Sequence, residues 1–579
     1  MRRYYLFLFP VILLCALPLY PWPSLPGSGL TVTINLLTCF VAGLWGLGLC
    51  FSLPWRRLRF GAAGRMLFIG LILLNLPGLW TPAPFRSEAI YRLAATAGFA
   101  FLLWMLLQLP VRGDQRRGIY GIVVVAALIQ ALLCLWQALL PLSAAHWLHY
   151  NPLVSGGRAT GAFGQANLLG SFLACGMLCA LWLSVTIRRK AISYLLLGCV
   201  VVLCVALMLS ESRTAWLGAA AGLFLLLWSA DRSRSRILII MVLGAGLLAG
   251  HGARMLRPTI LPVTASLAAG SAVQTPSTRN QPAKVEDRLS EDRHASNKER
   301  VALIRGAWAM IVKDPLWGQG TGTFETAFPV ALNQLGVANP FPVTVAHPHN
   351  EVLYAWVEGG SVALVGLICW LMLWALPFRF PRRGLARGAF SLPLIAHVMT
   401  EYPFYLSALH GVLMVVLLWL ALPVSARRCD FPCRHRKSVR AVLALGCMGC
   451  IAFMFTGLQS AWLIRKAEAS GFVTPEPLAQ VWNIYAQPER LQFDWAVTDL
   501  MQFNQTQDPR WLARFQRNAG DWLTRHNDPN LTETMIRIAA VQQKRALAEA
   551  WRQRGCLSYR TDQRFHCGTA SFFQPESFR

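Results

Sequence analysis

The sequence predicts an all-α protein that crosses a membrane many times, and three observations lead to this prediction. Of the 579 residues, 55% are hydrophobic and only 14% are charged, whereas a soluble globular chain carries about 25% charged residues. The mean hydropathy is +0.43. The apolar residues gather in runs close to the roughly 20 residues that a helix needs to cross a hydrocarbon core. We therefore expect a bundle of about 13 transmembrane helices.

The apolar runs follow one another along most of the chain. The first begins MRRYYLFLFP; it has no small-residue cleavage site and more runs follow, so we expect a retained helix and not a signal peptide. The centres of all the runs lie near residues 4–20, 30–53, 66–80, 91–109, 118–141, 167–187, 191–209, 214–229, 236–250, 352–376, 388–406, 407–424 and 441–463.

The positive charge is distributed as membrane topology requires. The formal net charge is +27. Basic clusters lie at Arg2-Arg3 and near residues 56–65, 112–117, 188–190, 232–236, 379–387 and 427–440. Each cluster after the first follows an even-numbered run, which is the positive-inside pattern of a protein with a cytoplasmic N-terminus. The charge therefore reflects topology, we expect no nucleic-acid partner, and residues 464–579 should lie outside the cytoplasmic membrane.

Two polar regions complete the predicted domain organisation. Residues 1–250 hold helices one to nine, 251–349 form a periplasmic loop, 350–463 hold helices ten to thirteen, and 464–579 form a small α-helical periplasmic domain. In the loop, residues 266–300 lack an apolar period and are predicted to be mobile, whereas 301–322 predict a helix on the outer membrane face. The tail predicts three or four amphipathic helices separated by Pro488, Pro509 and Pro529.

The 15 cysteines divide into three groups. Eleven lie in apolar runs, where cysteine behaves as a small hydrophobic residue. Cys429 and Cys433 lie in a basic loop and lack two further ligands for a metal. Cys556 and Cys567 share the external tail, where either a disulfide or two free thiols fit the sequence.

Polar residues near the outer face form a restricted set of site candidates. Ionisable groups in or beside a membrane are costly, so they are functional candidates by default. Arg158, Arg213 and Arg300 run against the positive-inside trend, and three converging guanidiniums suit a pyrophosphate, which they grip in bidentate fashion. The other candidates near this face are Gln165, Asn167, Glu211, Arg305, His347, His349, Asn350, Glu351, Glu401, Tyr402 and Tyr405.

His349, in the stretch HPHNEVLY (347–354), is the candidate general base. It lies just before a predicted helix start, where the helix dipole disfavours imidazolium, and a neutral imidazole accepts a proton from a hydroxyl. The alternative that His349, Asn350 and Glu351 only cap the helix explains the same stretch equally well. A zinc site at His347 and His349 lacks a third ligand. We expect replacement of His349 to be more damaging than replacement of His347.

Two further signals leave their interpretation open or weak. The glycine-rich GQGTG (318–322) follows no predicted strand and lacks the P-loop lysine, so a nucleotide site is not expected. Glu358 lies two helical turns after Glu351 and either pairs inside the bundle or takes part in chemistry.

Five stretches together resemble the O-antigen ligase/polymerase superfamily: GRATGAFGQANLLGSFLACG, SESRTAWLG, ERVALIRGAWAMIVKDPLWGQGTGTF, HPHNEVLYAWVEGG and HVMTEYPFY. Their order resembles the bacterial O-linked protein oligosaccharyltransferases (PglL type), over about residues 155–425, and the helical tail resembles the C-terminal domain of that branch. The resemblance implies that His349 is the essential loop histidine, Arg300 the loop arginine and Arg213 the Ser-Arg arginine. Arg158, Gln165 and Asn167 match the family's "R…G…Q-x-N" element. The family's tyrosine falls at Leu406, one place after Tyr405.

This resemblance implies an inner-membrane enzyme with its active site facing the periplasm. Its donor is an undecaprenyl-pyrophosphate-linked glycan and its acceptor a Ser or Thr of a periplasmic protein such as a pilin. Arginines bind the pyrophosphate, His349 activates the hydroxyl, and attack from the opposite face inverts the anomeric centre without a cofactor or metal. A lipopolysaccharide O-antigen ligase or an O-antigen polymerase shares this donor. A transporter of lipid-linked glycans is a third alternative, which charges at the outer face and the lack of internal repeats disfavour.

Overall fold

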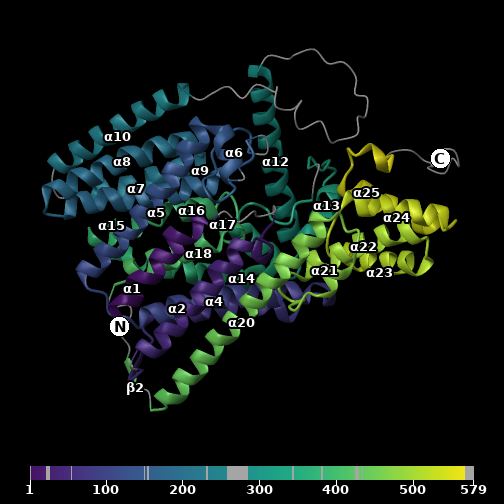
Figure 1. Cartoon of the computed structure of the whole chain (residues 1–579), viewed down its shortest axis with the longest axis horizontal. Coiled ribbons are helices and arrows are strands. Elements are labelled where there is room, and N and C mark those ends of the chain that lie inside the picture. Colours follow the sequence, from purple (N-terminus) through teal and green to yellow (C-terminus); the bar gives the residue numbers. More distant parts are fainter. Residues whose placement is uncertain are drawn as a thin grey trace.

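The computed structural model in Figure 1 is an α-helical bundle with a smaller helical domain at one end. The structure describes all residues except 1, 21–26, 54, 149, 153–154, 230–232, 257–284, 342–343, 380–381, 424–429, 433 and 568–579. Cys429, Cys433 and much of the stretch predicted to be mobile therefore lie outside the described residues.

Most of the predicted spans are present as helices. Among the described residues, eight helices are long and apolar enough to cross a membrane. They are α2 (Thr33–Ser52), α3 with η4 (Ala62–Leu79), η5 with α4 (Ala83–Leu107), α5 (Gly113–Leu139), α7 (Ala166–Thr186), α8 (Lys190–Ser210), α14 with η8 (Glu351–Arg379) and α20 (Arg436–Ala469). Four shorter apolar helices match four other predicted runs: the segment Tyr5–Leu19 that α1 (Arg2–Val11) opens, α9 (Arg213–Ser229), α10 (Ser233–Met255) and α18 (Ala408–Ala421).

The predicted span at 388–406 is wrong as a single helix. The structure has three short helices there: α15 (Arg383–Ala389), α16 (Leu392–Val398) and α17 (Pro403–Leu406). Pro393 and Pro403 lie in the first turns of α16 and α17, and a proline cannot continue a preceding helix because it lacks the N–H. The break leaves Glu401 in a non-helical segment at the end of the bundle that holds the candidate site.

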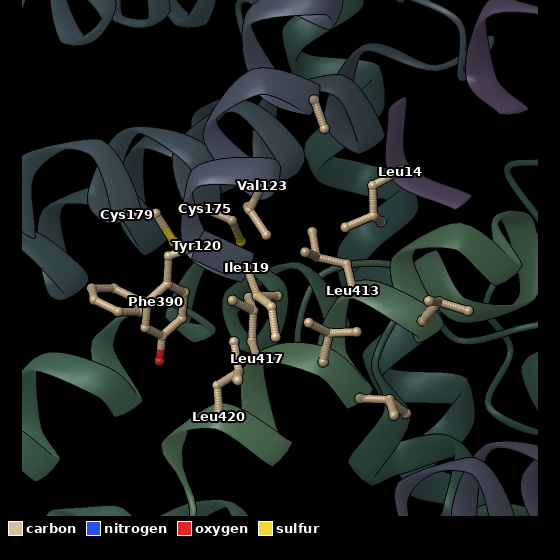
Figure 2. Packing of buried hydrophobic residues seen from close by; sticks show 14 of the residues in the cluster. Leu14, Ile119, Tyr120, Val123, Cys175, Cys179, Phe390, Leu413, Leu417 and Leu420 are labelled. Carbon is tan, nitrogen blue, oxygen red and sulfur yellow. The ribbon is translucent and has the colours of Figure 1, made fainter. Parts of the chain in front are cut away.

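The bundle packs around α7. Of the 18-residue apolar window in α7, 89% is buried, so this helix lies at the centre of the bundle. In Figure 2, side chains of α5 and α18 meet those of α7 and Phe390 in this core. Close packing, and not water exclusion, holds helices together in a membrane; a Cβ added at Gly176 would overlap Ala127 of α5. The labelled core residues are Leu14, Ile119, Tyr120, Val123, Cys175, Cys179, Phe390, Leu413, Leu417 and Leu420.

The structure places the loops at the two ends of the bundle as the predicted alternation of spans requires. Strand β1 (Arg57–Arg59) pairs antiparallel with β2 (Asp430–Pro432), so the loops after the second and twelfth predicted spans lie at the same end. At the other end lie α12 (Val285–Lys313), α13 (Phe324–Gln334) and the C-terminal helices (Figure 1). The short helix α6 (Pro141–Leu148) follows α5, and the short helix α21 (Glu476–Ala479) follows α20.

After the short α21, the tail forms four longer helices: α22 (Pro488–Thr506), α23 (Pro509–Leu523), α24 (Pro529–Val541) and α25 (Arg545–Ser558). The three prolines begin helices, because the first helical position needs no N–H donor. Side chains of Asp508 and Asp528 cap α23 and α24. Cys556 and Cys567 form a disulfide, which decides between the two alternatives that the sequence left open.

Helix α12 is longer than the sequence predicts. It begins at Val285, so residues 285–300 are helical although we expected a mobile stretch up to residue 300. The reason lies in composition: no proline or glycine occurs between Pro282 and Gly306, and Glu, Arg and Lys are good helix formers.

Candidate active site

Asn350 is the N-cap of α14, as the capping interpretation predicts. Its Oδ1 accepts a hydrogen bond from the Leu353 N–H at 3.0 Å, and its Nδ2 donates to the Met399 carbonyl at 3.0 Å. Asn350 thereby fixes α14 against the segment that carries Glu401. Because Asn350 performs the capping, His349 is left free of that role.

His349 precedes the cap in a strained conformation. Its φ is +56°, in the left-handed region that few non-glycine residues adopt, at a cost of about 1–3 kcal/mol. The His349 N–H donates to Nδ1 of His347 at 2.9 Å. That bond stabilises the turn that places the His349 ring against the edge of Tyr402, with the ring centroids 5.1 Å apart.

His347 is buried and both of its ring nitrogens are engaged. Nδ1 accepts from the His349 N–H, and Nε2 lies 3.3 Å from Oε2 of Glu351. Because Nδ1 acts as an acceptor, the proton of a neutral His347 belongs on Nε2. The ring also packs on Tyr354 and Tyr402, with centroid separations of 4.2 and 4.7 Å. These engagements argue against the alternative of a zinc site shared by His347 and His349.

Tyr405 lies in the same cluster. Its hydroxyl donates to Oε1 of Glu351 at 3.1 Å, so one carboxylate receives hydrogen bonds from His347 and from Tyr405. The Tyr405 ring also lies near His347, with the ring centroids 5.6 Å apart, so the structure brings Tyr405, one place before Leu406, to this cluster.

Glu401 connects the Q-x-N element to the EYP element. Its carboxylate accepts from Gln165 Nε2 at 3.0 Å and from Asn167 Nδ2. His397 Nε2 lies 3.0 Å from the same carboxylate, and His397 Nδ1 lies 2.9 Å from the Ser171 hydroxyl. Three predicted residues from two distant parts of the chain, Gln165 with Asn167 and Glu401, therefore form one hydrogen-bonded group.

The surroundings of His349 keep its imidazole neutral. Burial lowers the pKa of His349 below its ordinary value, and the charges of His347 and Arg300 lower it further, while Glu401 opposes them. A neutral imidazole at pH 7 is the form that accepts a proton. The arrangement suits a general base that acts on a hydroxyl group.

The three predicted arginines have different surroundings. Arg158 is half-buried and holds the corner between α8 and α9; it donates to the carbonyls of Ser210 and Glu211 and to Asn167 Oδ1 at 3.1–3.2 Å. Arg213 begins α9 and Arg300 lies in α12. Both are exposed, and neither side chain has a hydrogen bond or ion pair to another residue that the structure describes. Arg213 and Arg300 thus have guanidiniums available to an anion, and Arg158 joins the group around Asn167.

Two cations near the candidate site were not singled out from the sequence. Arg92 of α4 forms a buried ion pair with Glu358 at 2.5 Å and lies over the ring of Tyr354, which decides that Glu358 pairs inside the bundle. Arg254, at the end of α10, lies 3.5 Å from Glu211. His397 was not singled out either, although its position one helical turn before Glu401 was a signal in the sequence. Arg92 gave no such signal, because it lay within a predicted span.

The glycine-rich stretch 318–322 has a structural explanation. Helix α14 is broken at Gly360, where φ is +60°. The freed carbonyls of Val357 and Glu358 accept hydrogen bonds from the N–H groups of Gln319 and Gly320 at 2.8 and 2.9 Å. Glycine at 318 and 360 allows this backbone contact, because a Cβ at either position would overlap backbone atoms of the other segment. Irregular backbone at membrane depth requires such protein partners.

Two family models match parts of the chain. The O-antigen ligase model matches residues 198–371 and so includes Arg213, Arg300 and His349. A model described as "Virulence factor membrane-bound polymerase, C-terminal" matches residues 388–568, which include Glu401, Tyr405 and the four C-terminal helices. No curated protein and no solved structure matches the chain. Together the two matches support a membrane glycosyl-transfer or ligase function and the placement of the chain in the O-antigen ligase/polymerase superfamily.

Proposed function

We propose that the protein transfers an undecaprenyl-pyrophosphate-linked oligosaccharide en bloc to a Ser or Thr hydroxyl of a periplasmic protein, for example a pilin. The observation that carries this proposal is the strained, partly buried His349, which packs against Tyr402 and whose pKa is lowered by burial, so that its imidazole can accept a proton. The resemblance of the five sequence stretches to the protein-glycosylating branch supports the choice of acceptor.

In the proposed reaction, Arg213 and Arg300 bind the pyrophosphate of the donor. His349 accepts the proton of the acceptor hydroxyl while its oxygen forms a bond to the anomeric carbon. The bond from that carbon to the pyrophosphate oxygen breaks, and the lipid pyrophosphate leaves as an anion that the guanidiniums stabilise. Attack from the face opposite the leaving group inverts the anomeric centre. The arginines neutralise the charge that a metal ion neutralises in other pyrophosphate-releasing enzymes.

The test is co-expression of the protein with a donor pathway and a pilin acceptor, followed by intact-mass measurement of the pilin. We expect a mass increase of one glycan, which is lost in His349→Ala at matched protein level, since loss of a positioned base costs 10²–10⁴ in rate. Arg213→Ala and Arg300→Ala should also lose transfer, and Lys at either position should restore only part, because it cannot make bidentate contacts. An unmodified pilin beside extended lipopolysaccharide would instead favour a ligase.

An O-antigen ligase or O-antigen polymerase is the second candidate, because it needs the same donor site and the family descriptions name both. The two acceptors are distinguished by supplying the same purified donor with either a pilin or a lipopolysaccharide core. Transfer to the core alone would reassign the acceptor and leave the roles of His349 and the arginines unchanged.

We also infer the orientation in the inner membrane, with the candidate site facing the periplasm. The basic clusters on the opposite end of the bundle support this orientation. Reporter tags at positions 270 and 500 should be accessible from the periplasm, and a tag at 383 should be cytoplasmic. A cytoplasmic tag at 500 would contradict the orientation.

A further inference from the structure

Helix α12 has an apolar stripe that other described parts of the protein do not cover. Val301, Ile304, Trp308 and Val312 recur at intervals of three and four residues, so they share one face of the helix. They are 49%, 56%, 52% and 62% exposed. A soluble helix normally turns polar residues to water on its outer face.

The opposite face of α12 is also apolar and is already occupied. Ala302, Leu303, Ala307, Met310 and Ile311 are buried in a cluster with α13 and the start of α14. The packing of α12 on the protein is therefore complete without the exposed stripe. The stripe requires another partner.

The stripe is continuous with the surface of two membrane spans. Trp308 contacts Trp356 of α14 edge to face, with ring centroids 5.9 Å apart. Beyond the helix end, Leu316 and Trp317 are exposed as well. The Trp317 carbonyl accepts from Trp80 Nε1 at 2.9 Å, and Trp80 directly follows the span that ends at Leu79. Tryptophans at this level are typical of the membrane–water interface.

The direction and the charge of α12 favour a lipid partner over a protein partner. In Figure 1, α12 runs across the direction of α7 and α8, as a helix lying along a membrane surface does. Arg305 and Lys313 are exposed and directly follow stripe residues Ile304 and Val312. Basic side chains beside an apolar stripe with tryptophan are the pattern of helices that lie in the interfacial layer.

We propose that the stripe Val301, Ile304, Trp308 and Val312, continued by Leu316 and Trp317, is a lipid-binding surface seated in the interfacial layer of the bilayer. Arg305 and Lys313 lie at the level of the phospholipid headgroups and favour anionic lipid. The surface anchors the loop that carries Arg300 and the glycine-rich stretch docked on α14. This inference does not depend on the proposed reaction.

The test places the whole protein in nanodiscs that contain a phospholipid with a diazirine in its acyl chain. After irradiation, trypsin cleaves at Arg300, Arg305 and Lys313, so the stripe falls in two peptides, 301–305 and 306–313. We expect lipid adducts on Ile304, Trp308 and Val312 and not on the buried face. The control is peptide 538–544, which holds Val541: this side chain is 80% exposed in α24 but is remote from the spans.

Two variants sharpen the result. Ile304→Asp with Trp308→Asp should reduce adducts in both stripe peptides several-fold and leave adducts on the α20 span unchanged. Arg305→Glu with Lys313→Glu removes two tryptic sites, so its adducts are assigned to single residues after digestion with chymotrypsin, and the parent is digested in the same way. This variant should abolish the increase in adducts on Ile304, Trp308 and Val312 that anionic lipid produces over zwitterionic lipid. Adducts no more frequent than on the Val541 peptide would overturn the proposal. A stripe that gains no adducts in nanodiscs holding two copies of the protein would also overturn the proposal. It would indicate that the stripe contacts a second copy of the protein and not lipid.

Discussion

At the scale of single residues, the candidate site separates two histidines that the sequence left side by side. His347 has both ring nitrogens engaged and packs among tyrosines. His349 has a left-handed backbone conformation and is only partly buried. His347 therefore suits a positioning residue, and His349 suits a residue that touches substrate.

The first prediction concerns the pH dependence of transfer. A lowered pKa leaves His349 neutral at pH values above it, so kcat/KM should fall only at pH below the ordinary histidine value of about 6.5. Arg300 lowers the pKa of His349, so Arg300→Gln should move this acid limb to higher pH, besides weakening donor binding. The measurement is the pH profile of kcat/KM, with Arg517→Gln as the control because Arg517 is exposed on α23. Identical limbs in all three proteins would contradict the role of His349.

The second prediction concerns His347. We expect His347→Phe to keep the ring packing but to remove the acceptor that holds the His349 N–H, so kcat should fall on the order of 10²-fold, the usual cost of a misplaced catalytic group. KM for the donor should change little. The structure thus predicts a larger effect for His347 than the sequence did. A chelator should leave the transfer activity of the parent enzyme unchanged. Loss of activity with a chelator would instead support the alternative of a zinc site at His347 and His349.

At the scale of elements, the sequence predicted those features that depend on local composition. Apolar run length located the spans, and Pro488, Pro509 and Pro529 located three helix starts in the tail. At 388–406 the apolar run length predicted one span, although Pro393 and Pro403 were a local signal for the break into short helices. The sequence could not show that Glu401, freed by this break, would contact Gln165 and Asn167, which are distant in the chain. For the same reason, the partners of Arg92 and of the glycine-rich stretch needed the folded structure.

The third prediction tests the break in α14. Gly360→Ala should destabilise the fold, because the left-handed backbone disfavours any side chain and the new Cβ would overlap the Leu316 carbonyl. A cost of about 3 kcal/mol is reasonable for combined strain and lost hydrogen bonds. Thermal unfolding in detergent measures it. Gly98→Ala is the matched control, since no atom lies within 4 Å of its added Cβ, and equal stability of the two variants would contradict the docking of 315–320 on the break.

At the scale of the whole molecule, the C-terminal helices are joined to the loop between the spans by polar contacts. His526 lies between two carboxylates, with Nδ1 2.9 Å from Glu325 of α13 and Nε2 3.0 Å from Glu489 of α22. Asn527 donates its N–H to Glu325 at 2.8 Å, and Asn339 donates to the Ser558 carbonyl at 2.7 Å. These contacts hold α13, which packs on α12, against the C-terminal helices.

The fourth prediction is that this junction weakens in alkali. Burial disfavours a charged His526, but its hydrogen bonds to Glu325 and Glu489 outweigh burial and raise its pKa to about 9. A folded pKa above the unfolded value of about 6.5 gives stability that is fully present below 6.5 and is lost as the pH rises through about 9. Amide hydrogen exchange in α13 and α24 should therefore accelerate between pH 7 and pH 9.5, after correction for the intrinsic pH effect. His526→Gln should exchange faster at pH 7 and lose this pH dependence, whereas the surface variant Arg517→Gln should behave as the parent. A parent junction equally protected at both pH values would show that the imidazolium does not hold the two parts together.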